Sequence, residues 1–541
     1  MLKILDAKFN SLTSAAFVIA ALGIISRLLG LVRDRILAGQ FGAGDELDVY
    51  YAAFRLPDFI YNIVILGALS AGFIPIFVGL LRNEEGKKYG DNEKAWDLLN
   101  NLLNIFALFL LIACLFLAVI SPWLVPLITP GFASEKIQLT IKLTRLMFLS
   151  PVFLGLSGLF GGVLQSFKRF FLFSLAPVLY NVGIIIGALF LTKYFGIYGL
   201  ALGVAFGAAL HLLVQIPSVF RLGFVYKFIF NLKDIEFLKI IKMMVPRILG
   251  LASGQLNLII VTFFASALAA GSLAIFNLSN NLQSFPIGIF GGSFALAVFP
   301  ALAKSFSDNN EADFKDIFHK TFKQILFFVI PFSILLIILR AQIIRVVLGS
   351  GRFNWEDTVL TANSLGIFCF SLFAQSLLPL LARAFYARHD TMTPFITSFI
   401  GMLVNAVLSW IFVKQFGVLG LALGFSISMI VYFILLFVLL KIKVKGIGSD
   451  GILMALFKVS IASLVMGAIV QFMKTFMAGF VDMQTFSGIL TQGAVAAFAG
   501  VIAFTIVGYL LKTEELLNFV AGFKRKMWKM VRIKEAISDN Q

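Results

Sequence analysis

Long apolar segments alternate with short polar ones along the whole chain. Each apolar run of about 20 residues is long enough to cross a hydrocarbon core of roughly 30 Å as an α-helix. A membrane barrel would instead need segments of about 10 residues in which apolar and polar positions alternate. The pattern therefore predicts an all-α polytopic membrane protein with about fourteen transmembrane helices. They are expected near residues 12–36, 48–80, 97–120, 137–163, 170–190, 199–220, 240–268, 272–302, 318–340, 358–386, 392–412, 418–440, 453–474 and 486–511.

The composition supports this assignment and excludes some kinds of site. The 541 residues are 60% hydrophobic and 13% charged, with a mean hydropathy of +0.98, whereas soluble domains are about 25% charged. The two cysteines, Cys114 and Cys369, both lie in apolar runs, so they supply neither a disulfide framework nor a cysteine-based zinc site. Arg27 interrupts the first apolar run, which predicts a retained first helix rather than a cleaved signal peptide.

The net charge of +17 is explained by membrane topology. On the fourteen-helix count, one side of the membrane holds about 30 of the 44 basic residues and the loops opposite hold about nine. The positive-inside rule then places both termini in the cytoplasm, and no nucleic-acid partner is expected. The basic tail, residues 516–541, contains KRKMWKMVRIK. We expect it to rest on anionic lipid headgroups, with a partner-binding site as the alternative.

An internal duplication divides the chain. RLLGL at 27–31 returns as RILGL at 247–251, and FGIYGLALG at 195–203 returns as FGVLGLALG at 416–424, at offsets of 220 and 221. A looser pair matches GALSAGFIP with GSFALAVFP. Because six helices precede the second copy, both copies enter the membrane in the same direction and form parallel repeats. The predicted parts are an N-lobe (1–230), a C-lobe (231–446), two further helices (447–515) and the tail.

Charged residues occur inside the predicted spans of the first lobe, where burial costs at least about 2.5–3.5 kcal/mol each. Arg27 and Asp34 are seven residues apart, about two helical turns, and so share a face. We interpret the following residues as one wall of a polar cavity: Arg27, Arg33, Asp34, Asp48, Arg55 and Arg145. Arg35, Asp45 and Glu46 lie near helix ends, where a snorkelling side chain is the simpler interpretation.

The corresponding part of the second lobe is less charged. Arg247 repeats the position of Arg27, but the eighth span, NLSNNLQSFPIG, is polar and uncharged, with Asn281 as a candidate ligand-binding residue. Arginines with few unpaired acids favour an anionic ligand, because guanidinium binds phosphate oxygens bidentately and stays charged. A proton-coupled drug exporter would favour a titratable acid in mid-membrane.

Enzyme motifs are missing from the sequence. The three histidines, His211, His319 and His389, are far apart, and no HExxH, GxSxG, P-loop or dinucleotide-binding pattern occurs in a suitable context. The loops are too short to form a catalytic domain. We therefore expect a non-enzymatic membrane protein without cofactor or metal.

The segment SRLLGLVRDRILAGQFGAGDELDVYYAAFRLPDF, followed by GALSAGFIPIF, resembles the start of the MurJ/MviN family. These proteins are lipid II flippases of bacterial cell-wall synthesis, and they belong to the MOP superfamily with the MATE exporters. RFFLFSLAPVLYNVGIIIG, FPIGIFG and FYARHDTMTP look like further family segments in the same order. The resemblance spans the whole chain, and the division into six, six and two helices also matches.

The resemblance implies roles for individual residues. Arg27, Arg33, Asp34 and Asp48 match charged positions important in the family, and Arg55 matches a basic one. The arginines would hold the diphosphate of an undecaprenyl-linked disaccharide-pentapeptide, and the last two helices would help form a groove for its lipid tail. The implied location is the bacterial inner membrane, among membrane lipids and with cell-wall synthesis proteins as candidate partners.

The chain also departs from the family pattern. Tyr61 and Leu66 stand where members often have a basic residue and then an acid, and Asn281 stands where many have an arginine. Arg247 or Arg145 is the candidate to compensate for the missing charge. The function expected from the sequence is alternating-access export of lipid II. Its alternatives are a related exporter of another polyprenyl-linked glycan or a drug, and a non-transporting membrane scaffold.

Overall fold

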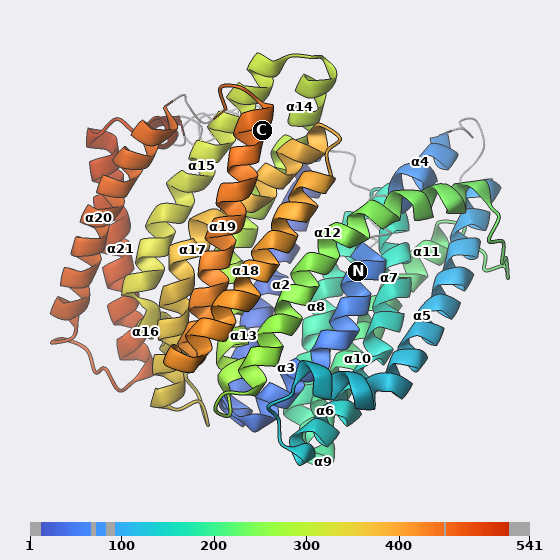
Figure 1. The fold of residues 1–541 in the computed structure, drawn as a ribbon, viewed down its shortest axis with the longest axis horizontal. Helices are drawn as coiled ribbons and strands as arrows, with labels where there is room; N and C mark the ends of the chain where they lie inside the picture. Colours follow the sequence, from blue (N-terminus) through green and yellow to red (C-terminus); the bar gives the residue numbers. More distant parts are fainter. Residues whose placement is uncertain (1–11, 67–71, 83–91, 448–450, 519–541) are drawn as a thin grey trace, which may run out of the picture. The chain divides into compact units, whose positions relative to one another are not determined.

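The computed structural model describes residues 12–66, 72–82, 92–447 and 451–518, without the side chains at 12–17, 64–66, 245–247 and 249–251. Described residues are helical apart from turns and short connections, as predicted, and none of them forms a strand (Figure 1). Most of the looser repeat pair's first copy, Lys87, Lys88 and the tail from residue 519 onward lie outside this part.

The helices follow one another along the described chain (Figure 1). Their bounds in chain order are α2 (Leu12–Phe41), α3 (Asp45–Ile60), η1 (Tyr61–Leu66), α4 (Ile74–Arg82), α5 (Glu93–Ile128), α6 (Ser134–Met147), α7 (Leu149–Ser166), α8 (Phe170–Ile186), η3 (Gly187–Leu191), α9 (Thr192–Phe195), α10 (Tyr198–Leu213), α11 (Ile216–Arg221), α12 (Ile235–Ser266), α13 (Ser272–Pro286), η4 (Ile287–Gly292), α14 (Ser293–Ser307), α15 (Glu311–Ile338), α16 (Arg340–Val347), α17 (Trp355–Ala387), α18 (Met392–Phe416), α19 (Val418–Lys443), α20 (Ile452–Met477) and α21 (Phe486–Leu510).

Eleven helical segments in the described part are long and apolar enough to cross a membrane. The predicted spans at 12–36, 48–80 and 240–268 each include residues or side chains outside the described part, and they are not among these eleven segments. In α12 the apolar stretch with described side chains is Ala252–Ser266, and α2 and α3 carry the charged candidate residues. The exact count of fourteen therefore stays a prediction.

The chain forms two compact units, each discontinuous in sequence. The first comprises Met1–Leu278, Val347–Leu360 and Ser398–Gly424, and the second comprises Ser279–Val346, Thr361–Thr397 and Phe425–Gln541. The lobe boundaries near 230 and 446 remain predictions from the duplication.

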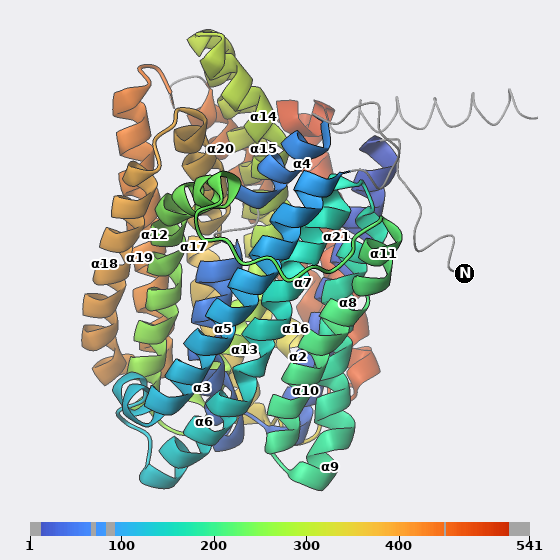
Figure 2. The same cartoon turned by 90° about the vertical axis from the view of Figure 1, so that its right-hand side faces the viewer.

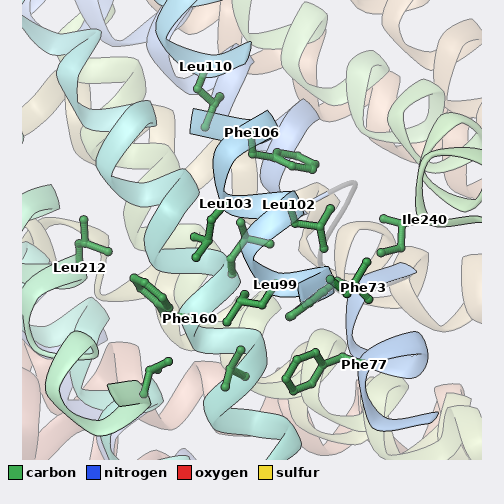
Figure 3. Packing of buried hydrophobic residues seen from close by; sticks show 14 of the residues in the cluster. Phe73, Phe77, Leu99, Leu102, Leu103, Phe106, Leu110, Phe160, Leu212 and Ile240 are labelled. Carbon is green, nitrogen blue, oxygen red and sulfur yellow. The ribbon is translucent and has the colours of Figure 1, made fainter. Parts of the chain in front are cut away.

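The core of the first unit is rich in aromatic side chains. Phe73, Phe77 and Phe160 pack with the apolar face of α5, of which Leu99 and Leu102 are fully buried (Figure 3). Trp96 and Phe167 add a stacked ring pair whose centroids are 5.7 Å apart. Because aromatic pairs add about 0.5–1.5 kcal/mol beyond their buried area, these contacts stabilise the packing of α5 against α7.

The duplicated motif has the same local geometry in both copies. Gly196 and Gly417 both have a positive φ, +54° and +57°, at the turn between paired helices. The turns before α8 and α18 also match: Lys168 and His389, 221 positions apart, have φ values of +60° and +59°. In each turn, the next residue's backbone N–H donates to the carbonyl five residues earlier. The repeat predicted from sequence is thus visible as repeated backbone conformation.

Glycines allow α8 and its π-helical continuation η3 to approach α10 closely (Figure 2). A Cβ at Gly203 would lie 2.5 Å from the Cα of Gly187, and one at Gly207 would lie 2.5 Å from the carbonyl oxygen of Tyr180. Small residues at such crossings are typical of membrane helix packing, where close backbone approach replaces the hydrophobic effect.

The connection between α11 and α12 lies against α5. Three asparagines of α5 hold its backbone: Asn100 bonds Val225 and Lys227, Asn101 bonds both backbone polar groups of Asn231, and Asn104 donates to two carbonyl oxygens. The side chains of α5 consequently hold this connection, which lies near the predicted lobe boundary, in one conformation.

In the second unit, α20 and α21 pack on each other and α20 packs beside α15 (Figure 1). Val459, Ala462, Met466 and Val470 of α20 form a buried row against apolar residues of α15 and α21. The two helices outside the duplication are thereby attached to the second unit through α15.

Candidate functional site

Arg33 and Asp34 form an ion pair inside the first unit. The Arg33 Nε and Nη2 atoms both donate to Asp34 Oδ1, at 3.0 and 2.8 Å, and Nη1 donates to Asn181 Oδ1 at 3.1 Å. Asp34 is buried, whereas 23% of the Arg33 side chain is exposed. Within the described chain, each terminal nitrogen of Arg33 keeps one N–H that these bonds do not use. Arg33 therefore keeps N–H donors that an anion can accept.

Arg55 is held by two helices that follow later in the sequence. Its Nε donates to Thr262 Oγ1 of α12 at 2.7 Å, and its Nη2 donates to Asn277 Oδ1 of α13 at 2.8 Å. Asn277 in turn donates to the Leu273 carbonyl oxygen, which fixes the orientation of the amide. Arg55 is 7% exposed. Neutral side chains thus accept part of the hydrogen bonds of a buried guanidinium, and the carboxylate of Asp58 lies close enough to interact with its charge.

Asp48 caps the start of α13. Its carboxylate accepts hydrogen bonds from the backbone N–H groups of Gly271 and Ala274, at 2.8 and 2.9 Å, and from Lys136 Nζ at 3.0 Å. Asp48 is 1% exposed. A carboxylate at a helix N-terminus is favoured by the unpaired N–H groups there and by the helix dipole. The geometry makes Asp48 a connection between helices rather than a free ligand.

Further contacts surround Asp48 at the same end of the first unit. The Arg352 N–H donates to the Gly39 carbonyl at 2.8 Å, the Ala43 N–H to Asp357 at 3.2 Å, and the Gly131 N–H to Ser266 at 3.1 Å. We call the contacting segments, residues 39–48, 129–136, 266–274 and 350–357, the loop seal. It joins turns of the predicted N-lobe to turns of the predicted C-lobe.

The remaining predicted site residues are less closely grouped. Arg27 is exposed on α2. Arg145 is exposed, and its Nε donates to the Ala118 carbonyl and to Ser121, both on α5. Arg247 lies in α12 with its side chain outside the described atoms, and Asn281 lies half-buried in the part of α13 that belongs to the second unit. The structure thus groups Arg33 with Asp34, places Arg55 and Asp48 each in a network of its own, and turns Arg145 towards α5.

Sequence reasoning missed three residues of these networks. Asn181 and Thr262 are polar residues within apolar helices, a signal that could have identified them. Lys136 is one of few basic residues in the loops of the side predicted to be poor in positive charge. All three orient charged side chains predicted from the sequence.

A serine-histidine pair in the first unit gives no support to hydrolysis. The Ser157 hydroxyl lies 2.6 Å from His211 Nδ1 and accepts a hydrogen bond from Gln215 at 2.6 Å. Ser157 is completely buried, and among the described contacts of His211 there is no carboxylate to orient its ring. Among described residues, no group of three or more His, Cys, Asp or Glu side chains is placed to hold a metal ion.

A sequence model of the family described as "Lipid II flippase MurJ" matches residues 37–491. A probable lipid II flippase MurJ of Vibrio cholerae is 30% identical over 428 residues, which cover 77% of this chain and 80% of that protein. The corresponding protein of Buchnera aphidicola from Schizaphis graminum is 28% identical over 92% of this chain and 96% of its own length.

Solved structures give the same result for the fold. A lipid II flippase MurJ in an inward closed conformation has a TM-score of 0.74 and 26% identity, and it covers 92% of this chain and 99% of its own. An inward-facing multidrug resistance MATE transporter of the MOP superfamily has a TM-score of 0.66 at 16% identity, covering 80% of this chain and 99% of its own. The second likeness concerns the fold alone.

Proposed function

Because the chain belongs to the MurJ family of lipid II flippases, we propose that this multi-pass membrane protein exports lipid II by alternating access. The headgroup moves from the cytoplasmic to the outer leaflet of the bacterial inner membrane, and both termini lie in the cytoplasm. The observation that carries the proposal is that Arg33 and Arg55 are held by polar partners inside a helical membrane unit with donors left over. Buried positive charge of this kind suits a diphosphate.

Arg33 is the residue proposed to grip the diphosphate first. Asp34 and Asn181 hold its side chain in one orientation, so little side-chain entropy is lost when an anion binds. Arg55 contributes positive charge from α3, and Arg27 contributes it from the exposed face of α2. These three arginines outnumber the two acids near them, Asp34 and Asp58, and this small excess of positive charge disfavours the organic cations that a drug exporter binds.

The second-lobe residues remain part of the proposal. Asn281 would bind sugar or peptide groups through its amide, and Arg145 and Arg247 would compensate for the arginine that many relatives have at the eighth span. The double variant Arg145→Gln/Arg247→Gln tests this compensation. Transport equal to wild type in that variant would remove both residues from the site.

The loop seal is proposed to close the outer end of the pathway. On the topology predicted by the positive-inside rule, its four segments all lie on the outer side of the membrane. Opening to the outside then requires Asp48 to release the N-terminus of α13. The charge-assisted bonds that break are worth about 1.5–3 kcal/mol each, a size that binding of an anionic headgroup can offset.

The bending points are proposed at two similar places. Pro57 precedes the π-helical turn η1, and Pro286 precedes the π-helical turn η4. Proline removes a helix hydrogen bond, and π-turns leave others irregular. We therefore expect α3 and α13 to bend most easily at these points, which lie close in sequence to Arg55 and to Asn281, the proposed headgroup-binding residue.

An apolar cavity supports a site for the lipid tail in the second unit. It has a volume of about 610 Å³ and is lined by α15, α17, α19 and α20, including Phe322, Phe370, Phe437 and Leu453. The described residues of α21 do not line this cavity, so the proposed tail site rests on α20 and its neighbours.

The membrane potential is a sufficient driving force for the proposed export. Moving each negative charge outward across an inside-negative membrane releases about 2.3 kcal/mol per 100 mV. No step in this scheme requires a cofactor.

The test is complementation of a strain in which its own lipid II flippase is conditionally depleted. Wild type is expected to restore growth and Arg33→Ala to fail, because a lost charged hydrogen bond of about 3 kcal/mol would weaken headgroup binding by about two orders of magnitude. Arg27→Ala is tested beside it, and Arg221→Ala, an exposed arginine of the same unit, is the matched control.

The rivals predict other results. A scaffold without transport activity tolerates Arg33→Ala, and an exporter of another glycan or a drug fails to rescue although wild type reaches the membrane in normal amount. Either result overturns the proposal.

A further inference from the structure

A second cavity, distinct from the apolar one, lies where α15 and the end of α21 meet. Its volume is about 550 Å³, and seven of its lining residues lie on one face of the first half of α15. The opposite wall consists of Glu514, Glu515 and Asn518, which follow α21. The transport scheme uses none of these residues.

The two walls carry opposite charge. Lys315, Lys320 and Lys323 line the cavity from α15, and the two glutamates face them. Lys320 is paired with Asp316 on its own helix at 2.6 Å, and Lys315 lies 3.9 Å from Glu311. Within the described chain, no ion pair joins the lysines to Glu514 or Glu515. The cavity therefore separates a cationic wall from an anionic wall instead of neutralising them.

The cavity lies at the level of lipid headgroups. Lys323 is the last charged residue of α15, and Gln324–Ile338 contains none. Likewise, α21 has no charged residue, and Lys512, Glu514 and Glu515 follow within five residues of its end. Such transitions mark the boundary between hydrocarbon and the polar interface. Tyr509, Leu510 and Leu517, all exposed, supply apolar surface beside the acidic wall.

We propose that this cavity binds the zwitterionic headgroup of an aminophospholipid of the phosphatidylethanolamine type. The lipid phosphate would contact Lys315 and Lys323, and its primary ammonium would donate to Glu514 and Glu515. A purely anionic headgroup would place charge against the two glutamates, and a quaternary ammonium has no N–H to donate to them. The acyl chains would lie along the exposed apolar residues at the end of α21.

The backbone keeps both walls in place. The Lys458 Nζ donates to the Lys512 carbonyl at 3.3 Å, which ties α20 to the turn that carries the glutamates. Lys323 Nζ lies beside Gly451, where a Cβ would approach it to 3.0 Å. The cavity is consequently lined by α15 and by the segment that follows α21, and Lys458 of α20 holds that segment.

The experiment measures lipid binding to the purified full chain in phosphatidylcholine nanodiscs. Phosphatidylethanolamine, phosphatidylglycerol or more phosphatidylcholine is added at equal mole fraction, and thermal unfolding and retained lipid by native mass spectrometry are recorded. We expect phosphatidylethanolamine to be retained about tenfold more than either other lipid, the factor that one charged hydrogen bond contributes, and to raise the unfolding midpoint.

Two double variants test the contribution of each wall to lipid binding. Glu514→Gln/Glu515→Gln is expected to abolish the preference for phosphatidylethanolamine over phosphatidylcholine, and Lys315→Gln/Lys323→Gln to lower retention of all three lipids. Lys193→Gln and Glu135→Gln, charge-neutralising changes in the other unit, are the matched controls and should leave retention unchanged.

Several outcomes overturn the proposal. Equal retention of the three lipids means that the headgroup is not recognised, and a preference for phosphatidylglycerol means an anion site. Full stabilisation by inorganic phosphate means a free-phosphate site. Since the assay measures binding without transport, its failure is distinguishable from failure of the proposed export.

Discussion

Arg55 shows how one side chain couples helices from both halves of the sequence. Its bonds to Thr262 and Asn277 need two nitrogens in the planar geometry of guanidinium. Arg55→Lys keeps the charge but presents a single nitrogen, so at least one acceptor loses its partner. We expect a lower unfolding midpoint and impaired complementation, with a loss in the range of about 1.5–3 kcal/mol for one charged hydrogen bond.

A double-mutant cycle distinguishes this geometry from general loss of packing. Asn277→Ala removes one acceptor, and the effects of Arg55→Lys and Asn277→Ala on thermal unfolding should be less than additive because both break the same bond. Arg221→Lys serves as the control. Fully additive effects would show that the two side chains do not interact.

Asp390 makes a pH-dependent contribution to stability at the turn before α18. Burial raises the pKa of this carboxyl, but the hydrogen bond from Lys443, the bonds from Thr393 and the positive charge of Lys443 outweigh it, so the pKa lies below its usual value. A lowered folded-state pKa stabilises the fold above the unfolded value of about 3.9, and the contribution is lost as pH falls below it.

Asp390→Asn should therefore lower the unfolding midpoint at pH 7 and have a smaller effect at the lowest pH at which the protein stays soluble. The measurement is thermal unfolding of the purified chain from pH 3 to 7, beside Asp316→Asn as an exposed control. A constant difference between Asp390→Asn and wild type across this range would contradict the assignment.

At the scale of elements, the close packing of α10 against α8 and η3 depends on glycine. At Gly203 even a methyl group would overlap the backbone of Gly187. Gly203→Val should force the helices apart, expose their polar backbone and strongly reduce the amount of folded protein in the membrane. Gly23→Ala in α2, where no atom lies within 4 Å of the added Cβ, is the control and should not reduce the amount of folded protein, since alanine favours helix by about 1 kcal/mol over glycine. The measurement is fluorescence-detected size exclusion; a normal Gly203→Val profile would contradict the prediction.

The sequence predicted the repeated turns, because a local sequence motif determines their conformation. The FG turn and the GLALG motif recur at a fixed offset, and their backbone conformation recurs with them. The sequence could not show that Asp48 caps α13 or that Arg55 reaches α12 and α13, because these partners are separated by more than 200 residues. Arg145 was predicted on charge alone, and only the structure reveals that it bonds to α5.

At the scale of the whole molecule, hydropathy predicted the all-helical membrane fold, and eleven of its spans are recognised in the described chain. The helices α2, α3 and α12 carry the ion pair, the buried arginine and one of its partners. Hydropathy located these helices but could not show which of their polar residues meet, because the partners are distant in sequence. On the proposed function, the polar residues of these helices are needed to bind an anionic headgroup.

Alternating access requires the loop seal to open, and a covalent link across it tests this directly. A Cβ at Gly39 would lie 3.5 Å from the Cβ of Ser350, within the 3.5–4.5 Å separation typical of disulfides. We expect Gly39→Cys/Ser350→Cys to crosslink under oxidation, to fail in complementation and to recover when a reductant is added, because the linked turns can no longer separate. Each single cysteine is the control for its own substitution, and the native Cys114 and Cys369 are buried and unlinked. Growth supported by a fully crosslinked protein would show that the seal need not open, and would remove alternating access through this end of the molecule.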